Sequence, residues 1–375
     1  MTPDSLPVNL YDFEAAALAR LPRPTRDYYC GGANDEITLE RNRAAYEAIP
    51  IHYRVLRDVS HRDLSTSVLG IPLSMPIVVA PTACHQLAHP DGELATARAA
   101  GAAGTLMMIS TLANYAMEDI SRVATGPLWF QLYVYRDRGV TLELLQRAAA
   151  AGCRAIVLTV DAPVGGQRER DVRNDFCLPE GIVLRNLLPA GRSFAGLEDK
   201  GSAAAYINAM FDPSISWRDL DWLAVHTQLP VLVKGLVRAD DAVRAREHGA
   251  QGVIVSNHGG RQLDTSPATI EVLESITTAI DGRIEVLIDG GVRRGTDVLK
   301  ALALGARAVL VGRPILWGLA VDGEPGVRRV LDILRQELDV AMALAGCCSV
   351  DEIDTDLIRP PTPAVARPST RWQPT

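Results

Sequence analysis

Short apolar runs alternate with amphipathic, Ala/Leu-rich stretches along most of the chain after residue 75. The apolar runs are rich in β-branched residues, which is typical of strands buried on both faces. They lie at residues 76–81, 105–110, 128–134, 155–161, 230–236, 252–257, 285–290 and 308–312. The stretches between most of them predict helices at residues 91–103, 117–124, 140–151, 216–227, 240–248, 267–280 and 295–304, with a final helical region at 314–346.

Strands that alternate with helices predict parallel βαβ units and therefore an α/β fold. Eight such units predict a closed (β/α)8 barrel, the TIM barrel. The alternative, a doubly wound open sheet, would require a Gly-x-Gly-x-x-Gly turn after its first strand, and the sequence has none. Short helices are expected at residues 9–21 and 25–30, and scattered apolar runs at 46–74 suggest a lid or hairpin across the bottom of the barrel.

One connection is much longer than the others. About fifty residues separate the strand that ends near Asp161 from the helix that begins at Ser216, whereas βα loops usually have about two to six residues. Residues 190–202 within it are small, polar and rich in glycine. We therefore expect this loop to act as a lid over the mouth of the barrel, with a passive insertion as the alternative.

The predicted elements form one domain. We expect it to cover residues 1–358, with an N-terminal helical segment at 1–75 and the barrel at 76–346. Residues 359–375 are rich in proline and are expected to form a tail without a fold of its own.

Every predicted strand ends in at least one hydrogen-bonding side chain. In a parallel barrel these carboxyl ends meet at one rim, which is where catalytic groups are found. Burying so many polar groups costs free energy unless a ligand or a partner satisfies them. The rim residues include Thr82, Ser110, Gln131, Tyr133, Thr159, Asp161, Lys234, Ser256, His258, Asp289, Arg293 and Arg313.

The last two strand ends indicate a phosphate site. Asp289-Gly290-Gly291 and Gly312-Arg313 offer bare backbone amides and a guanidinium just before a helix. This is the phosphate position of many barrels. Turn glycines and solvated arginines are the structural alternative.

Lys234 closes the buried run Val231-Leu232-Val233 and has three interpretations. It could be an imine-forming nucleophile with a depressed pKa. It could instead be a fixed positive charge beside a cofactor that becomes anionic, or one half of a plain ion pair with a carboxylate.

A general base and an anion clamp are the last candidates. A histidine backed by a carboxylate, here His258 and Asp161, can act as a base because its protonated form is stabilised. Arg168 and Arg261 suit bidentate capture of a carboxylate substrate. The hydroxyl groups of Tyr28 and Tyr133 could complete the clamp.

Composition excludes several other classes of protein. The net charge of -7 argues against nucleic acid as the main partner. The six cysteines show neither Cys-x-x-Cys pairs nor zinc-finger spacing, so we expect no metal or disulfide framework and a cytoplasmic location. His85 and His89 are four residues apart, but no third ligand is evident. We expect neither a signal peptide nor a membrane span.

The stretch Ser256-Asn257-His258-Gly259-Gly260-Arg261-Gln262-Leu263-Asp264 resembles the active-site signature of the FMN-dependent L-2-hydroxy acid oxidases, a family that includes glycolate, lactate and mandelate-oxidising enzymes. Further similar motifs follow in the family's order, from Tyr28-Tyr29 to Gly312-Arg313-Pro314. The resemblance implies that FMN is the cofactor. The residues it implies for flavin binding are Pro81, Thr82, Ala83, Ser110, Gln131, Thr159, Lys234, Ser256, Asp289, Gly291, Arg293, Gly312 and Arg313.

The same resemblance implies the chemistry. Tyr28, Arg168 and Arg261 would hold the substrate carboxylate, Tyr133 would lie on the hydroxyl side, and His258 would be the base, oriented by Asp161. The α-hydrogen would pass to the flavin, or the base would take it as a proton. Lys234 would stabilise the charge that builds on the flavin, and oxygen would reoxidise it to give hydrogen peroxide. Another electron acceptor and a Schiff-base lyase that uses Lys234 are the alternatives.

One departure from the family concerns the substrate. Leu112 stands where glycolate oxidases carry a tryptophan. The smaller side chain should enlarge the pocket, so we expect lactate or an aryl acid such as mandelate to be preferred over glycolate. The resemblance also implies a homo-oligomer, a tetramer or an octamer, with no nucleic acid or membrane partner.

Overall fold

Within residues 7–187 and 210–359, the ranges that the computed structural model describes, eight parallel strands close into a barrel. The strands are β3 (Ile77–Val79), β4 (Met107–Ile109), β5 (Leu128–Leu132), β6 (Ile156–Thr159), β7 (Val231–Leu236), β8 (Gly252–Val255), β9 (Glu285–Ile288) and β10 (Ala308–Val311). Each pairs with the next, and β10 pairs with β3. The predicted (β/α)8 barrel is confirmed. The predicted lid at 190–202 lies outside the described residues, as does the predicted tail beyond residue 359.

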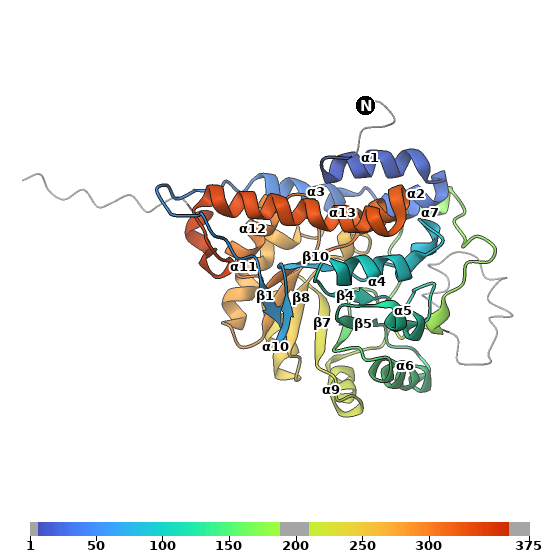
Figure 1. The fold of residues 1–375 in the computed structure, drawn as a ribbon. Helices are drawn as coiled ribbons and strands as arrows, with labels where there is room; N and C mark the ends of the chain where they lie inside the picture. The colour runs from blue at the N-terminus through green and yellow to red at the C-terminus, as the bar shows by residue number, and fades with distance from the viewer. Residues whose placement is uncertain (1–6, 188–209, 360–375) are drawn as a thin grey trace, which may run out of the picture.

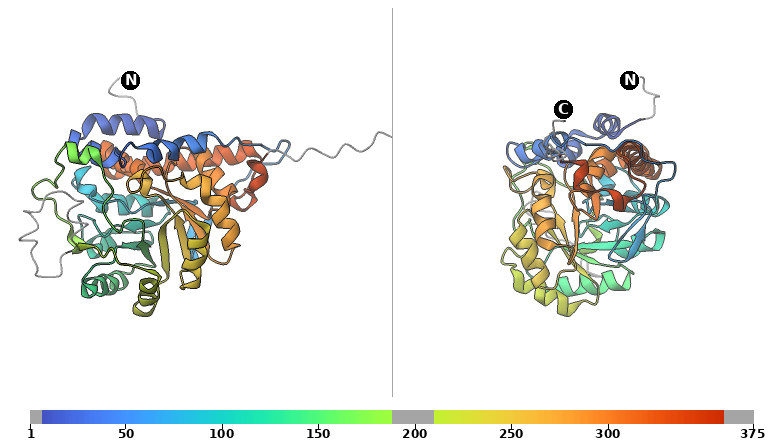
Figure 2. Two further views of the ribbon diagram at one scale, coloured as in Figure 1. Left: turned by 180° about the vertical axis from the view of Figure 1, so that it is seen from behind. Right: turned by 90° about the vertical axis from the view of Figure 1, so that its left-hand side faces the viewer.

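Helices surround the strands on all sides (Figure 2, right). They are α4 (Gly92–Ala102), α5 (Met117–Val123), α6 (Arg138–Ala150), α9 (Trp217–His226), α10 (Ala239–Glu247), α11 (Thr269–Ile280), α12 (Gly295–Ala303) and α13 (Arg313–Ala345). Short 3₁₀ turns lie at His85–Leu87, Arg185–Leu187, His258–Gly260, Val350–Glu352 and Thr355–Leu357. The long helix α13 is interrupted at Asp322 and Gly323, whose backbone leaves the helical region. The predicted helices agree with these bounds to within a few residues.

The barrel interior is an apolar core closed at one end by a hairpin. Its layers contain side chains such as Val78, Met108, Trp129 and Ile254. The antiparallel strands β1 (Thr66–Val68) and β2 (Ile71–Leu73) form the hairpin, and Val68, Ile71 and Leu73 join the same cluster. The backbone amide of Leu69 donates to Glu285, the first residue of β9. The hairpin therefore seals the amino-terminal end of the barrel, as expected for residues 46–74, and leaves the opposite end for ligands.

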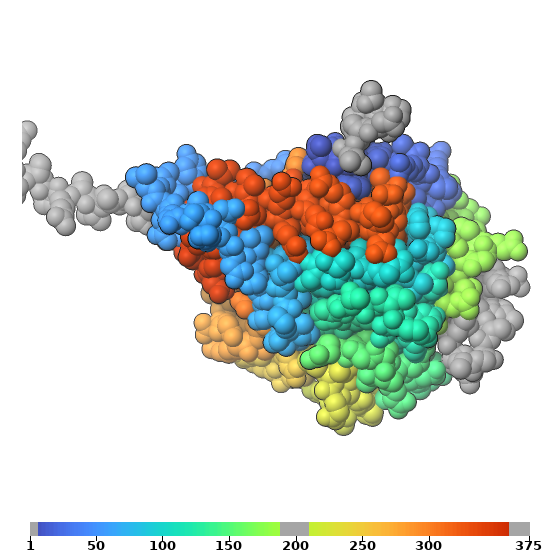
Figure 3. Space-filling view, in the orientation of Figure 1, coloured from blue at the N-terminus to red at the C-terminus, as the bar shows by residue number. Residues whose placement is uncertain are grey.

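The amino-terminal helices pack across one side of the barrel. Helix α1 (Leu10–Arg20) lies along α13, which in turn covers α4 (Figures 1 and 3). Helix α2 (Arg23–Cys30) follows and carries Tyr28. Residues of the amino-terminal segment and of the barrel share one hydrophobic core.

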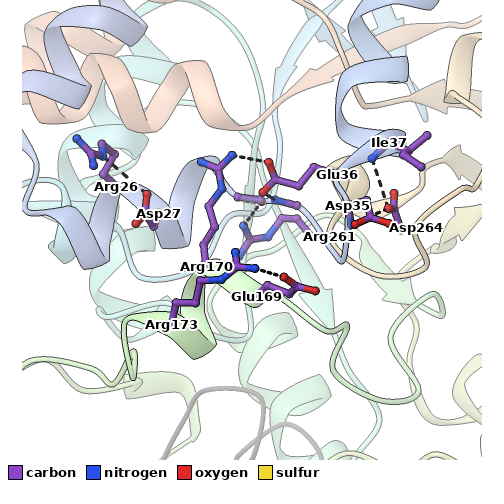
Figure 4. Close-up of polar contacts among 12 residues, drawn as sticks. Arg26, Asp27, Asp35, Glu36, Ile37, Glu169, Arg170, Arg173, Arg261 and Asp264 are labelled. Carbon is purple, nitrogen blue, oxygen red and sulfur yellow. Dashed lines mark hydrogen bonds and ion pairs between the residues drawn. The ribbon is translucent and has the colours of Figure 1, made fainter.

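Two helices were not predicted, α3 (Ile37–Glu47) and α7 (Glu169–Arg173). The start of α3 has no local side-chain cap. Instead, the carboxylate of Asp264 accepts hydrogen bonds from the amides of Thr38, at 2.9 Å, and Asp35, at 3.1 Å. Figure 4 shows a further hydrogen bond of this kind, in which the backbone amide of Ile37 donates to the carboxylate of Asp264. Because this cap comes from a distant part of the chain, the local sequence does not signal where the helix begins.

Candidate active site

A pocket opens at the carboxyl ends of the strands and gathers most of the predicted site residues. Those that line it are Tyr28, Pro81, Thr82, Ala83, Ser110, Leu112, Tyr133, Arg168, Lys234, His258, Arg261, Asp289, Gly291, Arg293, Gly312 and Arg313. The other four, Asp161, Gln131, Thr159 and Ser256, are buried or half-buried in contact with lining residues or next to them in the sheet. The structure therefore brings the whole predicted set together.

His258 and Asp161 form an oriented pair. The Nδ1 atom of His258 lies 2.8 Å from Oδ1 of Asp161. Burial alone would raise the pKa of Asp161, but His258 and Lys234 outweigh it and lower that pKa, so the carboxylate stays ionised. Because Nδ1 is bound to Asp161, Nε2 is the ring nitrogen that remains for a ligand.

A glycine makes room for this pair. Strand β7 shifts register between Lys234 and Leu236, and Gly235 between them has a φ of +109°. A Cβ at Gly235 would lie 2.6 Å from the side chain of Asp161. Only glycine combines this backbone conformation with that clearance, so Gly235 is what allows Asp161 to reach His258.

Lys234 is a buried ammonium with two polar partners. Its Nζ atom lies 3.0 Å from Oδ2 of Asp289 and donates to Oγ of Ser256 at 2.8 Å. The same Ser256 hydroxyl oxygen accepts the backbone N–H of His258. Burial alone would lower the pKa of Lys234, but Asp289 and Asp161 outweigh it and raise that pKa. A lysine held in its charged form is a poor imine-forming nucleophile, so the geometry favours a fixed positive charge.

Two arginines face the pocket beside Tyr28. Arg261 donates to the carbonyl oxygens of Tyr28, at 2.5 Å, and Gly31, at 3.0 Å, and neither partner carries a charge. Burial and the charge of Arg168 lower the pKa of Arg261 to about 10. Arg168 is 3.8 Å from Asp171, and its Nε has no hydrogen-bond partner among the described residues. Two guanidinium groups that repel each other in a buried site favour an anionic ligand.

Each of the two pocket tyrosines is stacked on a phenylalanine. Tyr28 lies flat on Phe176, with ring centroids 4.5 Å apart, and Tyr133 lies on Phe211 at 4.4 Å. Burial raises the pKa of both tyrosines, so their hydroxyl groups remain protonated donors. The two phenylalanines come from opposite ends of the long connection after β6, and the sequence analysis did not identify them.

Unsatisfied buried polar atoms line the side of the site next to β5, β6 and β9. Within the described ranges they include Nε2 of Gln131, Oγ1 of Thr159, Oδ1 of Asp289 and Nε of Arg293. The Oε1 atom of Gln131 already accepts the amide of Thr111 at 3.1 Å, which leaves its amide group for a ligand. Such atoms are costly without a partner. A flavin with a polar ring edge and a ribityl chain offers complementary donors and acceptors, so these residues fit FMN.

The arginines after β9 and β10 fit a phosphate. Arg293 and Arg313 line the same pocket. Burial lowers the pKa of Arg293, and burial together with Arg261 and Arg293 lowers the pKa of Arg313 to about 9. The backbone carbonyl oxygens of Tyr29 and Gly259 accept from Arg313 and fix its guanidinium in place. A phosphate would supply the negative charge that offsets the repulsion between these buried arginines.

The backbone amides at the start of α12 were not part of the predicted phosphate site, and they are occupied. The amides at the start of α12 are not bare, because Asp297 accepts from Arg293, at 2.9 Å, and Arg294, at 3.0 Å. The amide of Gly295 donates to Glu337. The sequence could not reveal that the amide of Gly295 is occupied, because its partner Glu337 lies in a different helix. The pocket is lined by the side chains of Arg293 and Arg313 and by the turn Gly290-Gly291, rather than by the end of α12.

His85 and His89 do not form a metal site. The ring of His85 is held between Thr82 and Thr96, and the described residues contain no cluster that could hold a metal ion. All six cysteines lie within the described ranges as free thiols. Across those same ranges, no helix has the length and apolar character needed to cross a membrane.

Three further residues of the Ser256–Asp264 stretch support the site. Asn257 and Asn42 exchange side-chain hydrogen bonds at 2.9 and 2.8 Å. Gln262 donates to the carbonyl oxygens of Asp161 and Val164, which fixes the loop that leads to Arg168. With Asp264 at the start of α3, they tie the amino-terminal helices to the rim. Figure 4 shows this region, where Arg170 also pairs with Glu36.

Comparison with known proteins agrees with this geometry. The family model described as FMN-dependent dehydrogenase matches residues 17–360. An L-lactate oxidase of Nostoc sp. is 50% identical over 96% of this chain and 100% of its own length. Glycolate oxidase 3 of Arabidopsis thaliana is 51% identical over 94% of this chain and 95% of its own. A crystal structure of mandelate oxidase superposes with a TM-score of 0.86 at 44% identity, covering 92% of this chain and 96% of that one. The chain therefore belongs to the FMN-dependent dehydrogenase family.

Proposed function

We propose that this chain is an FMN-dependent (S)-2-hydroxy acid oxidase that acts on lactate or on an aryl acid such as mandelate in preference to glycolate. The observation that carries the proposal is that His258, which contacts Asp161, lines one pocket with Arg168 and Arg261. This arrangement supports a base and a receptor for a carboxylate at the same rim. The relatives named as lactate, glycolate and mandelate oxidases support the reaction class.

In the proposed reaction, some pocket residues bind the substrate carboxylate and others transfer a proton. Arg168, Arg261 and the hydroxyl of Tyr28 hold the substrate carboxylate, which positions the 2-carbon. His258 takes one proton from the substrate, and Asp161 stabilises the imidazolium that results.

The remaining residues serve the cofactor. When bound, FMN accepts the two electrons of the oxidation, and oxygen removes them to give hydrogen peroxide. Lys234 supplies the fixed positive charge for the reduced flavin. Gln131, Thr159 and Asp289 meet its polar groups, and Arg293 with Arg313 binds its phosphate.

Leu112 supports the substrate preference. Its side chain lines the pocket and is 9% exposed. A leucine leaves more room than an indole, so the pocket accepts a methyl or aryl substituent on the 2-carbon. A panel of glycolate, L-lactate and (S)-mandelate, assayed for oxygen consumption and peroxide, tests the proposal. The highest kcat/KM for glycolate would contradict the preference, and oxidation only with an added electron acceptor would indicate a dehydrogenase.

The Schiff-base alternative is less consistent with the site. Lys234 is paired with Asp289, and its raised pKa disfavours the neutral amine. Reduction with borohydride in the presence of substrate should leave the mass of the protein unchanged. A covalent adduct on Lys234 would establish the lyase instead.

We also propose a cytoplasmic homo-oligomer, a tetramer or an octamer. The free thiols of all six cysteines support a reducing compartment. Exposed apolar side chains such as Leu56, Val172 and Leu263 would be covered by self-association. Light scattering of the purified holoenzyme measures the assembly, and the mass of a monomer would contradict it.

A further inference from the structure

A buried histidine that the proposed mechanism does not use contacts a residue of the cofactor pocket. His85 is 1% exposed, and its Nε2 lies 2.6 Å from Oγ1 of Thr82. On the other side of the ring, Nδ1 lies 3.0 Å from Oγ1 of Thr96 in α4. Thr82 lines the pocket, whereas His85 lies behind it. The imidazole therefore joins a helix of the outer layer to the wall of the cofactor pocket.

The direction of these hydrogen bonds is assigned from the hydrogens that each group carries. The hydroxyl of Thr96 has one hydrogen, which it donates to the carbonyl oxygen of Gly92 one turn earlier in α4. Its oxygen then accepts from Nδ1–H of His85. A neutral imidazole has only one N–H group, so Nε2 is an acceptor and takes the hydrogen of the Thr82 hydroxyl. The 2.6 Å distance agrees, because O–H donors form shorter hydrogen bonds than N–H donors.

The imidazole is held in its neutral form. Burial lowers the pKa of His85 and outweighs the opposing effects of Glu93 and of the Thr82 backbone. The carboxylate of Glu93 accepts the backbone N–H of His85 at 3.2 Å, so it anchors the backbone of the residue. In this assignment, Thr96 sets the tautomer of His85.

We propose that His85 is a positioning residue that turns the hydroxyl hydrogen of Thr82 away from the pocket, so that Thr82 offers the flavin only acceptor lone pairs. Two-electron reduction adds an N5–H donor to the flavin ring. An acceptor-only neighbour favours the form with the additional donor. The Thr96–His85–Thr82 chain therefore raises the reduction potential of bound FMN. The inference rests on the proposed contact between Thr82 and the flavin.

The midpoint potential of the FMN in the holoenzyme tests this inference. His85→Phe removes the acceptor and keeps the bulk of a ring. It should lower the equilibrium constant for reduction roughly tenfold, which is about 30 mV for a two-electron couple. Thr96→Val should shift the potential in the same direction, because Nδ1–H loses its acceptor and the tautomer reverses. Thr96→Val provides the same test of the potential if the His85→Phe variant does not fold.

A double-mutant cycle separates the hydrogen bond from simple packing. In a Thr82→Val background, His85→Phe should no longer change the potential. His89→Asn, a change in the same loop, is the matched control and should leave the potential at the wild-type value. An unchanged potential in both single variants, or an equal shift in the Thr82→Val background, would overturn the inference.

These measurements also distinguish a failure of the proposed function from a failure of the inference about His85. If no 2-hydroxy acid reduces the wild-type flavin but the potential still shifts in the variants, the function is wrong and the role of His85 stands. If the acids reduce the flavin in every variant and the potential does not move, the function stands and the role of His85 is wrong. Wild-type protein that binds no FMN would overturn both.

Discussion

The buried charge of Arg261 and the groups around it determine its proposed role as a receptor for a carboxylate. Its guanidinium is buried, donates to backbone carbonyls and faces a second arginine. Neither the carbonyls of Tyr28 and Gly31 nor Arg168 neutralises its charge. A substrate carboxylate would supply that counter-charge inside the pocket, where the interaction is little screened by water.

Arg261→Met should therefore weaken both the binding and the orientation of the acid. We expect kcat/KM to fall at least about thirtyfold, equivalent to about 2 kcal/mol, with a rise in KM and a lower kcat. Arg170→Met is the matched control, because Arg170 is nearby but half-exposed and pairs with Glu36. Steady-state kinetics with L-lactate measures both variants. An unchanged KM in Arg261→Met would show that the clamp is elsewhere.

Leu112→Trp tests the residue proposed to set the substrate size. The indole should fill the space above the 2-carbon and select smaller acids. We expect the ratio of kcat/KM for glycolate to that for (S)-mandelate to rise about tenfold or more, since steric exclusion of a ring from a packed pocket costs more than about 1 kcal/mol. The same substrate profile in the variant and the wild type would remove Leu112 from the pocket.

At the scale of elements, the two ends of the connection after β6 return to the site through aromatic contacts. Phe211 lies next to Asp212, whose amide donates to the carbonyl oxygen of Val134 just past β5. This pairing places the Phe211 ring on Tyr133. The connection is therefore attached to the segment just past β5 that carries Tyr133.

Phe211→Leu should loosen Tyr133 without removing its hydroxyl. An aromatic stack contributes about 0.5–1.5 kcal/mol, so we expect kcat to fall by roughly two- to tenfold. In a Tyr133→Phe background the same change should cost less, because there is no hydroxyl left to position. Single-turnover flavin reduction measures the cycle. Strictly additive effects would mean that Phe211 acts on stability alone.

The capping of α3 by Asp264 predicts a pH effect on stability. Burial alone would raise the pKa of Asp264, but the amides of Thr38, Thr265 and Ile37 outweigh it and lower that pKa. A carboxylate with a lowered pKa stabilises the fold above its unfolded value of about 3.9, and this stability is lost as the pH falls below that value.

Asp264→Asn should reduce the free energy of unfolding by about 1–2 kcal/mol at neutral pH, because an amide oxygen replaces a carboxylate that accepts several backbone hydrogen bonds. Below about pH 4 the difference from the wild type should shrink. Thermal unfolding at pH 7 and at about pH 3 gives both values. A difference that grows on acidification would contradict the assignment.

At the scale of the whole molecule, the sequence predicted what depends on local pattern. The strands, most helices and the polar residues at the strand ends were recognisable from periodicity and from the glycines that follow them. Contacts between distant segments were not. Asp264 caps a helix 226 residues away, and Phe176 reaches Tyr28 from a loop without periodicity. The sequence shows a glycine at position 235. The space that this glycine leaves for the side chain of Asp161 depends on the packing of β7, which the sequence does not show.

The closed barrel explains why residues from every strand end can act together. Closure places Lys234, His258 and Asp289 at one rim, although each comes from a different strand or loop. The amino-terminal helices complete that rim with Tyr28 and share the core of the barrel. We therefore propose that residues 1–358 form a single domain, as the sequence pattern predicts.

The central claim is that His258 acts as a base over a flavin held in this pocket, and anaerobic flavin reduction tests it most directly. Wild-type protein and His258→Ala, prepared with equal FMN content, are mixed with L-lactate or (S)-mandelate in the absence of oxygen. We predict rapid bleaching of the flavin absorbance in the wild type and a rate lower by about 10²–10⁴ in the variant. Equal rates of bleaching in the two proteins, or none in the wild type, would contradict the account.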